Sequence, residues 1–362
     1  MSLVWYKVLP AVFGGQKGIA NFNKALGKVA QLVCVCSKNN MPDEAGSYTV
    51  CNWLPNTKTQ ILNPTVLNKL VRFARQHSIS HVIIEHTFHA FAALLLRHLC
   101  KCSIIVHVHN VEYLRLKDAG KWYWRGVYYL ETLCYRAGNE FLFKSNEDLQ
   151  QVCQTFNVDR NQCFVVPYGI TRPREIYGQQ VSKALLKARH GVEKDDVLLL
   201  FTGSPGYLPN RKAVTDIYNY LLPILPAGYT IIITGATSAD FNFPEKPGFI
   251  LAGTVANLQE YYSAADVFIN PVDIGGGVQT KTLEAIAHDL SVVCWQTKTN
   301  GIDAEVIGKK LFAATPGNWE DFFSNIQIAL TIEQQTPASF YEYHSFDKHA
   351  RLLVDRWRKQ NA

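Results

Sequence analysis

The chain has 362 residues, of which 48% are hydrophobic and 18% are charged. This composition excludes a disordered or fibrous chain, and the length is sufficient for two globular domains. The longest apolar stretch, residues 90–96, is too short to span a bilayer, which needs about 20 residues.

The charge is distributed unevenly along the chain. Residues 1–170 hold 18 Lys and Arg against 10 Asp and Glu, a net charge of +8, and the remainder carries −2. A basic first half could face anionic lipid or an anionic acceptor, although a scattered, solvated surface would give the same count. Nine cysteines without zinc-ligand spacing favour a reducing compartment. We therefore expect a cytoplasmic protein, with peripheral contact at the inner membrane face as a hypothesis.

Short apolar runs alternate with helical stretches along the whole sequence, which predicts parallel sheets covered by helices on both faces. The expected strands of the first half are Leu3–Leu9, Leu32–Cys36, Val50–Leu54, His81–Glu85, Ser103–Val108, Glu140–Phe143 and Cys163–Val166. Those of the second half are Val197–Thr202, Tyr229–Thr234, Gly248–Leu251, Asp266–Asn270, Leu290–Trp295 and Lys310–Ala313.

A segment rich in Pro and Gly, from Pro167 to Gln180, separates the two sets of strands. We predict a first doubly wound domain at 1–170, a second at 171–340, and a final helix within 341–362. Two such domains would face each other across a cleft, with ligands at the carboxyl ends of the strands.

Two features of the first half could carry chemistry. Gly14 and Gly15 follow the first expected strand and precede a helix expected near Lys17, where bare backbone favours an anion. A tight structural turn is the alternative. His109 ends an expected strand in HVHNVEYLR and could donate a hydrogen bond or hold a proton, whereas His107 is deeper and is expected to be structural.

The segment GGGVQTKTLEAIAHDLSVV, residues 275–293, contains the strongest motif of the second half. Three glycines between a strand and a helix present free backbone N–H groups to a phosphate. Lys281 adds a cation in the first turns of the helix, and Glu284 is placed to reach sugar hydroxyls.

This segment resembles the donor loop of family 4 retaining glycosyltransferases of the GT-B fold. Glu284 to Ala287 match the second glutamate of the family's E-x7-E motif and the residues after it, and Ser291 to Val293 match its PVV. Gly276 stands where the first glutamate is usual. The sequence is therefore more similar to a subgroup with a G-G-G-x-x-T-K-x-L-E loop, in which Lys281 and the backbone replace that carboxylate.

The resemblance implies metal-independent transfer of a sugar, with retention of configuration, from a nucleotide-diphosphate sugar to a hydroxyl of a glycan or lipid-linked acceptor. It implies no cofactor, no metal and no nucleic-acid partner. It also implies that the final helix, within 341–362, crosses back to the first domain. Its HN-x-E motif places His109 beside the donor sugar, so the implied catalytic residues are His109 and Glu284. The implied donor-binding residues are Gly14, Gly15, Gly203, Asn210, Lys212, Gly235, Val255, Gly275, Gly276, Gly277, Val278, Thr280 and Lys281.

Other positions depart from the family pattern. Ser204 and Thr171 stand where arginine and aspartate are usual, and Lys212 lies two places after the expected lysine. A non-catalytic protein that binds a nucleotide sugar is therefore an alternative, and a sugar-nucleotide epimerase is another. A dinucleotide oxidoreductase is disfavoured because no G-x-G-x-x-G follows the first strand of either domain.

The aromatic stretch WYWRGVYY, from Trp122 to Tyr129, admits three interpretations. It could bind an acceptor sugar, lie at a membrane interface, or form a helix packed under the sheet.

Overall fold

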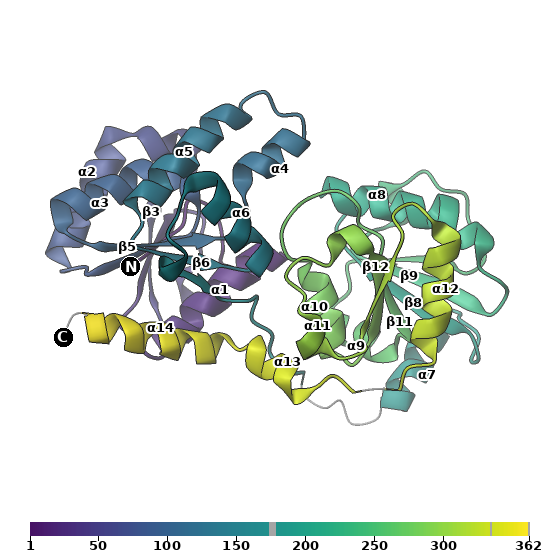
Figure 1. The fold of residues 1–362 in the computed structure, drawn as a ribbon. Coiled ribbons are helices and arrows are strands. Elements are labelled where there is room, and N and C mark those ends of the chain that lie inside the picture. Colours follow the sequence, from purple (N-terminus) through teal and green to yellow (C-terminus); the bar gives the residue numbers. More distant parts are fainter. Residues whose placement is uncertain (174–178, 334, 361–362) are drawn as a thin grey trace. The chain divides into compact units, whose positions relative to one another are not determined.

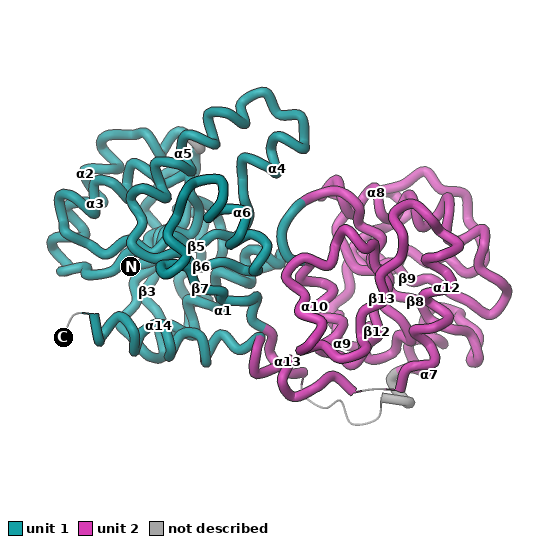
Figure 2. The backbone as a smooth tube through the Cα atoms, viewed as in Figure 1, with its two compact units in different colours: residues 1–169, 276–278, 344–362 teal, residues 170–275, 279–343 magenta. Residues whose placement is uncertain are grey.

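The computed structural model describes residues 1–173, 179–333 and 335–360. The chain forms two compact units, each built on one parallel sheet (Figures 1 and 2). Unit 1 contains Met1–Gly169, Gly276–Val278 and the segment from His344 onward, and unit 2 contains Ile170–Gly275 and Gln279–Tyr343. Part of the predicted linker, residues 174–178, lies outside the described residues.

The sheet of unit 1 has seven strands in the order β3-β2-β1-β4-β5-β6-β7. The strands are β1 (Ser2–Leu3), β2 (Val33–Ser37), β3 (Thr49–Leu54), β4 (His81–Ile84), β5 (Ser103–Val108), β6 (Glu140–Phe143) and β7 (Cys163–Val165). The helices are α1 (Gly14–Gly27), α2 (Pro64–Gln76), α3 (Ala90–Cys100), α4 (Glu112–Asp118), α5 (Trp124–Ala137), α6 (Asn146–Phe156) and α14 (Phe346–Gln360).

The strands of unit 1 are buried on both faces of their sheet. In β5, Ile104 and Val106 point into a core shared with α2, α3, α5 and α6, whereas Ile105 points into a second core with α1 and α14. Successive strand residues face opposite sides, so a sheet covered by helices on both faces needs continuous apolar runs. This requirement explains why the strands could be recognised as apolar runs in the sequence.

The sheet of unit 2 has six parallel strands in the order β10-β9-β8-β11-β12-β13. The strands are β8 (Val197–Thr202), β9 (Tyr229–Thr234), β10 (Phe249–Gly253), β11 (Val267–Asn270), β12 (Ser291–Trp295) and β13 (Leu311–Ala314). The helices are α7 (Gln179–Arg189), α8 (Leu208–Asp216), α9 (Leu258–Ala264), α10 (Thr280–Ala287), α11 (Ala304–Ile307), α12 (Trp319–Leu330) and α13 (Ala338–Tyr343).

Each sheet contains a point at which the strand order reverses. In unit 1 the chain builds β1, β2 and β3 toward one edge and then places β4 on the other side of β1. In unit 2 the corresponding neighbours are β8 and β11. Loops that leave neighbouring strands in opposite directions create a crevice at the carboxyl ends, where α/β proteins bind ligands. The predicted architecture of two doubly wound parallel sheets is confirmed.

Two predicted boundaries in the first half were wrong. The first strand ends at Leu3, not at Leu9, because the N–H groups of Val8 and Leu9 donate to Oδ1 of Asn40 at 2.7 and 2.8 Å and not to a neighbouring strand. Helix α1 begins at Gly14, earlier than expected, and Oε1 of Gln16 accepts the N–H groups of Val12 and Phe13 just before it.

The final helix, α14, packs in unit 1. It lies against α1, and the buried Glu140 of β6 accepts hydrogen bonds from Arg356, Trp357 and Gln360 of α14, each at 2.9 Å. Side chains from the C-terminal end of the sequence therefore complete the core of the first sheet.

Candidate functional site

The reversal point of unit 2 brings two glycine loops together. One loop begins at Gly203 after β8, and the other follows β11 and contains Gly275. Gly275 has φ +92°, and a Cβ there would lie 3.2 Å from Oη of Tyr207 in the Gly203 loop. The amine of Lys298 donates to the carbonyl of Gly275 at 2.7 Å. Glycine at position 275 therefore allows both a left-handed backbone and a close approach of the loops.

Lys281 and Asn210 meet at this place. Nζ of Lys281 donates to Oδ1 of Asn210 at 2.7 Å, and Nδ2 of Asn210 donates to the carbonyl of Ser204 at 3.1 Å. A Cβ at Gly203 would lie 2.6 Å from Cγ of Asn210, so glycine is required there. Burial lowers the pKa of Lys281 to about 7, although the negative charge of Glu284 acts to raise it. Because this partner of Lys281 is a neutral amide, the contact leaves the positive charge available to an anion.

Helix α10 carries the rest of the predicted donor motif. Thr280 is its first residue, and no side chain caps its N-terminus, whose N–H groups can bind an anion together with Lys281. Nδ2 of the buried Asn270 donates to Oγ1 of Thr282 at 3.0 Å and fixes the helix to β11. Glu284 follows Lys281 by one turn, and a carboxylate at this position can accept hydrogen bonds from sugar hydroxyls.

Aromatic residues support the second turn of α10. Oη of Tyr262 lies 3.5 Å from Oε2 of Glu284. The Tyr262 ring stacks on that of His288 with centroids 4.7 Å apart, and Nδ1 of His288 donates to the carbonyl of Glu284 at 2.8 Å. These contacts restrict the helix backbone from which Glu284 projects.

Lys212 lies in a different electrostatic environment from Lys281. It is paired with Asp216 at 2.5 Å and with Asp273 at 2.7 Å. Burial opposes its charge, but the two carboxylates raise its pKa. A phosphate would have to compete with both carboxylates for Lys212, whose predicted role in donor binding stays a prediction.

Gly235 and Val255 follow the next two strands of unit 2. Gly235 has φ +87°, its N–H donates to the carbonyl of Gly253 at 2.7 Å, and a Cβ there would lie 3.0 Å from the carbonyl carbon of Gly203. Gly235 therefore packs against the Gly203 loop. Val255 is half-buried in the turn after β10.

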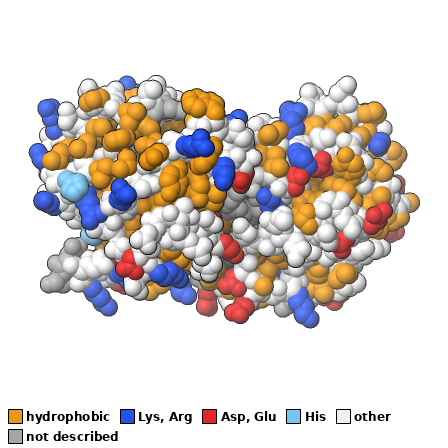
Figure 3. Space-filling model, turned by 45° about the horizontal axis from the view of Figure 1, so that its top comes forward, with side chains coloured by type: hydrophobic (Ala, Val, Ile, Leu, Met, Phe, Trp, Pro, Cys, Tyr) orange, Lys and Arg blue, Asp and Glu red, His pale blue; other side chains and the backbone are white. Residues whose placement is uncertain are grey.

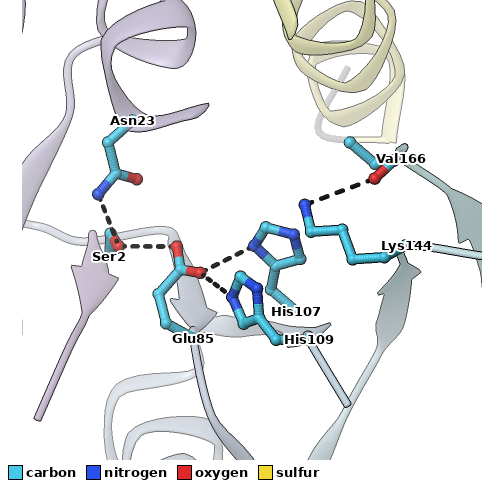
Figure 4. Close-up of polar contacts among 7 residues, drawn as sticks. All are labelled: Ser2, Asn23, Glu85, His107, His109, Lys144 and Val166. Atoms are coloured by element: carbon cyan, nitrogen blue, oxygen red, sulfur yellow. Dashed lines mark hydrogen bonds and ion pairs between the residues drawn. The ribbon is translucent and has the colours of Figure 1, made fainter. Parts of the chain in front are cut away.

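The reversal point of unit 1 holds a buried carboxylate between two histidines. Oε2 of Glu85, at the end of β4, accepts hydrogen bonds from Nδ1 of His107 at 2.8 Å and from Nε2 of His109 at 2.9 Å (Figure 4). Oε1 of Glu85 accepts the hydroxyl of Ser2 at 3.1 Å, and Asn23 of α1 donates to that hydroxyl at 3.2 Å. Residues from β1, β4, β5 and α1 thus converge on one carboxylate.

The ionisation of this cluster follows from its burial. Burial would raise the pKa of the Glu85 carboxyl, but His107 and His109 lower it well below its usual range. Burial lowers the pKa of His107 to about 4 and of His109 to about 3. Burial also lowers the pKa of the nearby Lys144 to about 7, although Glu85 opposes this shift. At neutral pH the carboxylate is therefore ionised and both imidazoles are neutral.

A second buried carboxylate holds the segment after His109. Glu131 of α5 accepts the N–H groups of Glu112 at 3.1 Å and of Tyr113 at 3.0 Å, at the start of α4. Burial raises the pKa of Glu131 to about 7, although both N–H groups favour its charged form. Glu112 itself is paired with Arg115.

Gly14 and Gly15 are the first residues of α1, after β1. Phe13, the N-cap residue, makes no side-chain hydrogen bond to this helix end, although Gln16 accepts the N–H of Phe13, and a Cβ built on Gly15 would meet no atom within 4 Å. Packing therefore does not explain Gly15, whereas close approach of a ligand would.

Two family models match the sequence. Residues 14–172 match the model described as Glycosyltransferase Family 4, and residues 196–331 match the model described as Glycosyl transferases group 1. These matches indicate a family 4 glycosyltransferase of the GT-B fold. The subgroup with the G-G-G-x-x-T-K-x-L-E loop stays a prediction.

Solved structures show the same fold for this chain over nearly its whole length. A glycosyltransferase from Rickettsia africae ESF-5 has a TM-score of 0.71 at 13% identity, covering 99% of this chain and 97% of that one. Anabaena HepE in complex with UDP and glucose has a TM-score of 0.70 at 12% identity, covering 99% of this chain and 100% of that one. The sucrose-phosphate synthase of Thermosynechococcus elongatus has a TM-score of 0.76 at 13% identity, covering 99% of this chain and 98% of that one. No curated protein sequence matches the chain.

The structure groups the predicted site residues by unit. Gly203, Asn210, Gly235, Gly275 and Lys281 are linked by the contacts described above. Thr280 and Glu284 lie on the same helix as Lys281, whereas Gly276, Gly277 and Val278, in the loop before that helix, are grouped with unit 1. Gly14, Gly15 and His109 belong to unit 1, where the two glycines begin α1 and His109 directly follows β5.

Sequence reasoning missed Glu85, Glu131 and Lys144 as site residues. Glu85 was detectable, because it ends the strand next to the one that carries His107 and His109, and the carboxyl ends of parallel strands meet at one edge. Glu131 gave no such signal, since it lies on a helix and reaches the site only through the tertiary fold.

The sequence predicted no metal site, and the cluster of Glu85, His107 and His109 bears on this prediction. Within the described part of the chain, Glu85, His107 and His109 form one group whose ligand atoms all lie within 4.8 Å of one another and which could hold a metal ion. The spacings of 2.8 and 2.9 Å match N–H···O hydrogen bonds.

The surface of unit 1 exposes aromatic and basic side chains together. Trp122 is 88% exposed and Tyr129 is 70% exposed, and Lys117, Lys121 and Arg125 are exposed beside them in sequence. We call these five residues the aromatic-basic patch. Figure 3 shows Lys and Arg side chains lying among hydrophobic ones on this unit. Among the described residues, no helix combines the length and the apolar character needed to cross a bilayer.

Proposed function

We propose that this chain transfers a sugar from a nucleotide-diphosphate sugar to a hydroxyl group of a glycan or lipid-linked acceptor. The observation that carries the proposal is the contact between Lys281 and Asn210 beside the glycine loops of unit 2. A half-buried cation, free backbone N–H groups and a carboxylate one turn away suit the diphosphate and the sugar hydroxyls of such a donor. Anabaena HepE, which shares the fold, was solved with UDP-glucose, so UDP-glucose is the first donor to test.

We propose further that transfer proceeds with retention and needs no metal ion or cofactor. The bond between the anomeric carbon and the phosphate oxygen breaks while the acceptor oxygen bonds to that carbon on the same face. The acceptor proton passes to the departing phosphate oxygen, and the nucleoside diphosphate leaves. Lys281 and the N-terminus of α10 would stabilise the negative charge that grows on the diphosphate, which is the task that a divalent cation performs in other enzymes.

The experiment combines binding and product analysis. Thermal shifts with UDP-, GDP-, dTDP- and CMP-sugars identify the donor, since a ligand that binds the folded state raises the melting temperature. Incubation of that donor with candidate acceptors, followed by NMR of the anomeric proton, reports the configuration of the product. Inverted product would refute retention, and loss of transfer in EDTA would refute metal independence. Absence of any thermal shift would refute the proposed function.

A non-catalytic nucleotide-sugar-binding protein is the second candidate. Gly276, Ser204 and Thr171 favour it, because they replace charged residues of the family pattern. Such a protein would show the thermal shift but neither transfer to an acceptor nor slow hydrolysis of the bound donor.

The proposed place of action is the cytoplasmic face of an anionic membrane, which the chain would contact without spanning. The aromatic-basic patch supports this proposal, because exposed Trp and Tyr side chains favour the interface and Lys and Arg are attracted by anionic headgroups.

A further inference from the structure

Glu85 is not part of the motif through which the sequence resembles the family, but it contacts the histidine of that motif. Its two carboxylate oxygens have different partners. Oε2 faces His107 and His109 of β5, and Oε1 faces Ser2 of β1 (Figure 4). The side chains of Glu85 and His107 are fully buried, and that of His109 is 12% exposed.

A neutral imidazole has one N–H donor and one acceptor nitrogen, and the hydrogen bond of one nitrogen fixes the role of the other. A carboxylate can only accept. His107 must therefore carry its proton on Nδ1, and His109 must carry its proton on Nε2. The two histidines are thus held in opposite tautomers by the same oxygen atom.

The surroundings of the rings maintain this arrangement. The His107 ring lies 4.9 Å from that of Phe22 and 4.3 Å from that of His109, measured between centroids. The ring of His86 stacks on the ring of His109, with centroids 5.1 Å apart. A ring flip would break the hydrogen bond to Glu85 and displace packed aromatic rings.

We propose that Glu85 is a positioning residue that fixes His109 as the Nε2–H tautomer, so that Nδ1 of His109 accepts a hydrogen bond from a substrate hydroxyl. This inference rests on the proposed function and deepens it. It assigns Nδ1 of His109 the role of a hydrogen-bond acceptor toward that hydroxyl, and it excludes a role as a proton donor from Nδ1.

The first measurement needs no variant. Long-range proton–nitrogen NMR of the ¹⁵N-histidine-labelled protein distinguishes a protonated from an unprotonated ring nitrogen, and His107→Gln and His109→Gln identify the signals. We expect Nδ1–H for His107 and Nε2–H for His109, unchanged between pH 6 and 8. A His109 ring protonated on Nδ1 would overturn the proposal, as would Zn²⁺ that shifts both histidines together.

Substitution tests the link to catalysis. Glu85→Leu removes the acceptor, and we expect a mixture of His109 tautomers and a loss of kcat of about tenfold or more, with unchanged donor affinity. Glu85→Gln retains one acceptor oxygen. It should restore part of the preference of His109 for the Nε2–H tautomer and part of kcat. His344 is an internal control in the same spectra, because its Nδ1 donates to the carbonyl of Tyr168 and not to Glu85. Full turnover in Glu85→Leu with a mixed tautomer would overturn the proposed role.

Failure of the proposed function gives a different result. A protein that transfers no sugar from any nucleotide donor would still show, by NMR, whether Glu85 sets the tautomer of His109.

Discussion

The amine of Lys281 lies 2.7 Å from the side-chain oxygen of Asn210, which joins residues 71 positions apart in the sequence. Both follow strands that are neighbours at the reversal point of the second sheet, β11 and β8. The contact therefore follows from topology, and it places a cation between two glycine loops.

The first prediction concerns donor affinity. Lys281→Ala and Glu284→Ala should each weaken nucleotide-sugar binding by about 1.5–3 kcal/mol, the scale of hydrogen bonds to charged groups. Isothermal titration calorimetry measures this directly. Lys194→Ala and Glu245→Ala are matched controls, because both residues are exposed in unit 2. Unchanged affinity in both Lys281→Ala and Glu284→Ala would refute the donor site.

The second prediction concerns the pH dependence of the same site. Burial lowers the pKa of Lys281 to about 7, so the free protein loses this charge as the pH rises through 7. A bound diphosphate favours the protonated amine and raises its pKa. Donor affinity should therefore be constant below pH 6 and fall by up to about tenfold per pH unit above 7.

Proton uptake checks this second prediction. Calorimetry at pH 8 in buffers of different ionisation enthalpy should show that a proton is taken up as the nucleotide sugar binds. Lys281→Met should abolish the uptake. Binding without uptake in the unmodified protein would mean that Lys281 is charged in both states or does not contact the donor.

The third prediction separates His109 from donor binding. His109→Ala should lose most of its turnover while donor affinity stays unchanged, because the donor cluster of unit 2 is intact. Glu85 keeps Ser2 and His107 as partners, so we expect the protein to remain folded. His98→Ala, an exposed histidine of α3, is the control. A His109→Ala protein with full turnover on a validated acceptor would remove His109 from the mechanism.

The fold could be predicted because apolar runs and their order determine a doubly wound sheet. All thirteen expected strands are present, and the largest difference is at Leu3–Leu9, where Asn40 takes the N–H groups that a strand would have used. No pattern among residues close together in the sequence predicts such a long-range hydrogen bond.

The site could be predicted less completely. Glycines and Lys281 gave a local signature, because phosphate binding needs bare backbone and a cation close together in sequence. Lys212 has the same residue type and a similar position, but it pairs with Asp216 one helical turn later and with Asp273, and only the tertiary fold brings Asp273 near it. Glu85 is likewise recognisable only once β4 and β5 are known to be neighbours.

The fourth prediction concerns the stability of unit 1. Glu140→Ala leaves the buried N–H of Trp357 without its acceptor and removes the partner of Arg356. It should destabilise the fold by about 1–3 kcal/mol. Asp347→Ala also removes a contact of α14, the pair with Lys28, but both side chains are about half exposed and the loss should be below about 1 kcal/mol. Urea unfolding measures the loss of unfolding free energy in each of the two variants. Equal losses in Glu140→Ala and Asp347→Ala would contradict the assigned importance of Glu140.

The fifth prediction concerns membrane contact by the aromatic-basic patch. Each basic residue near an anionic surface contributes roughly 1 kcal/mol, and exposed aromatic rings enter the interface. The protein should therefore sediment with vesicles in proportion to their anionic lipid, and the bound fraction should fall as salt rises.

Variants can locate the contact on the surface. Replacing Lys117, Lys121 and Arg125 by Gln should abolish binding at physiological salt. The same replacement at the exposed Lys38, Arg72 and Lys101 of unit 1 changes the net charge equally and should have a smaller effect. Equal losses in the two triple variants would mean that net charge, and not the patch, drives binding. Binding that persists in high salt but is lost in Trp122→Ala would assign it to the aromatic side chains. Absence of binding to anionic vesicles at low salt would exclude the membrane and point to an acceptor in solution.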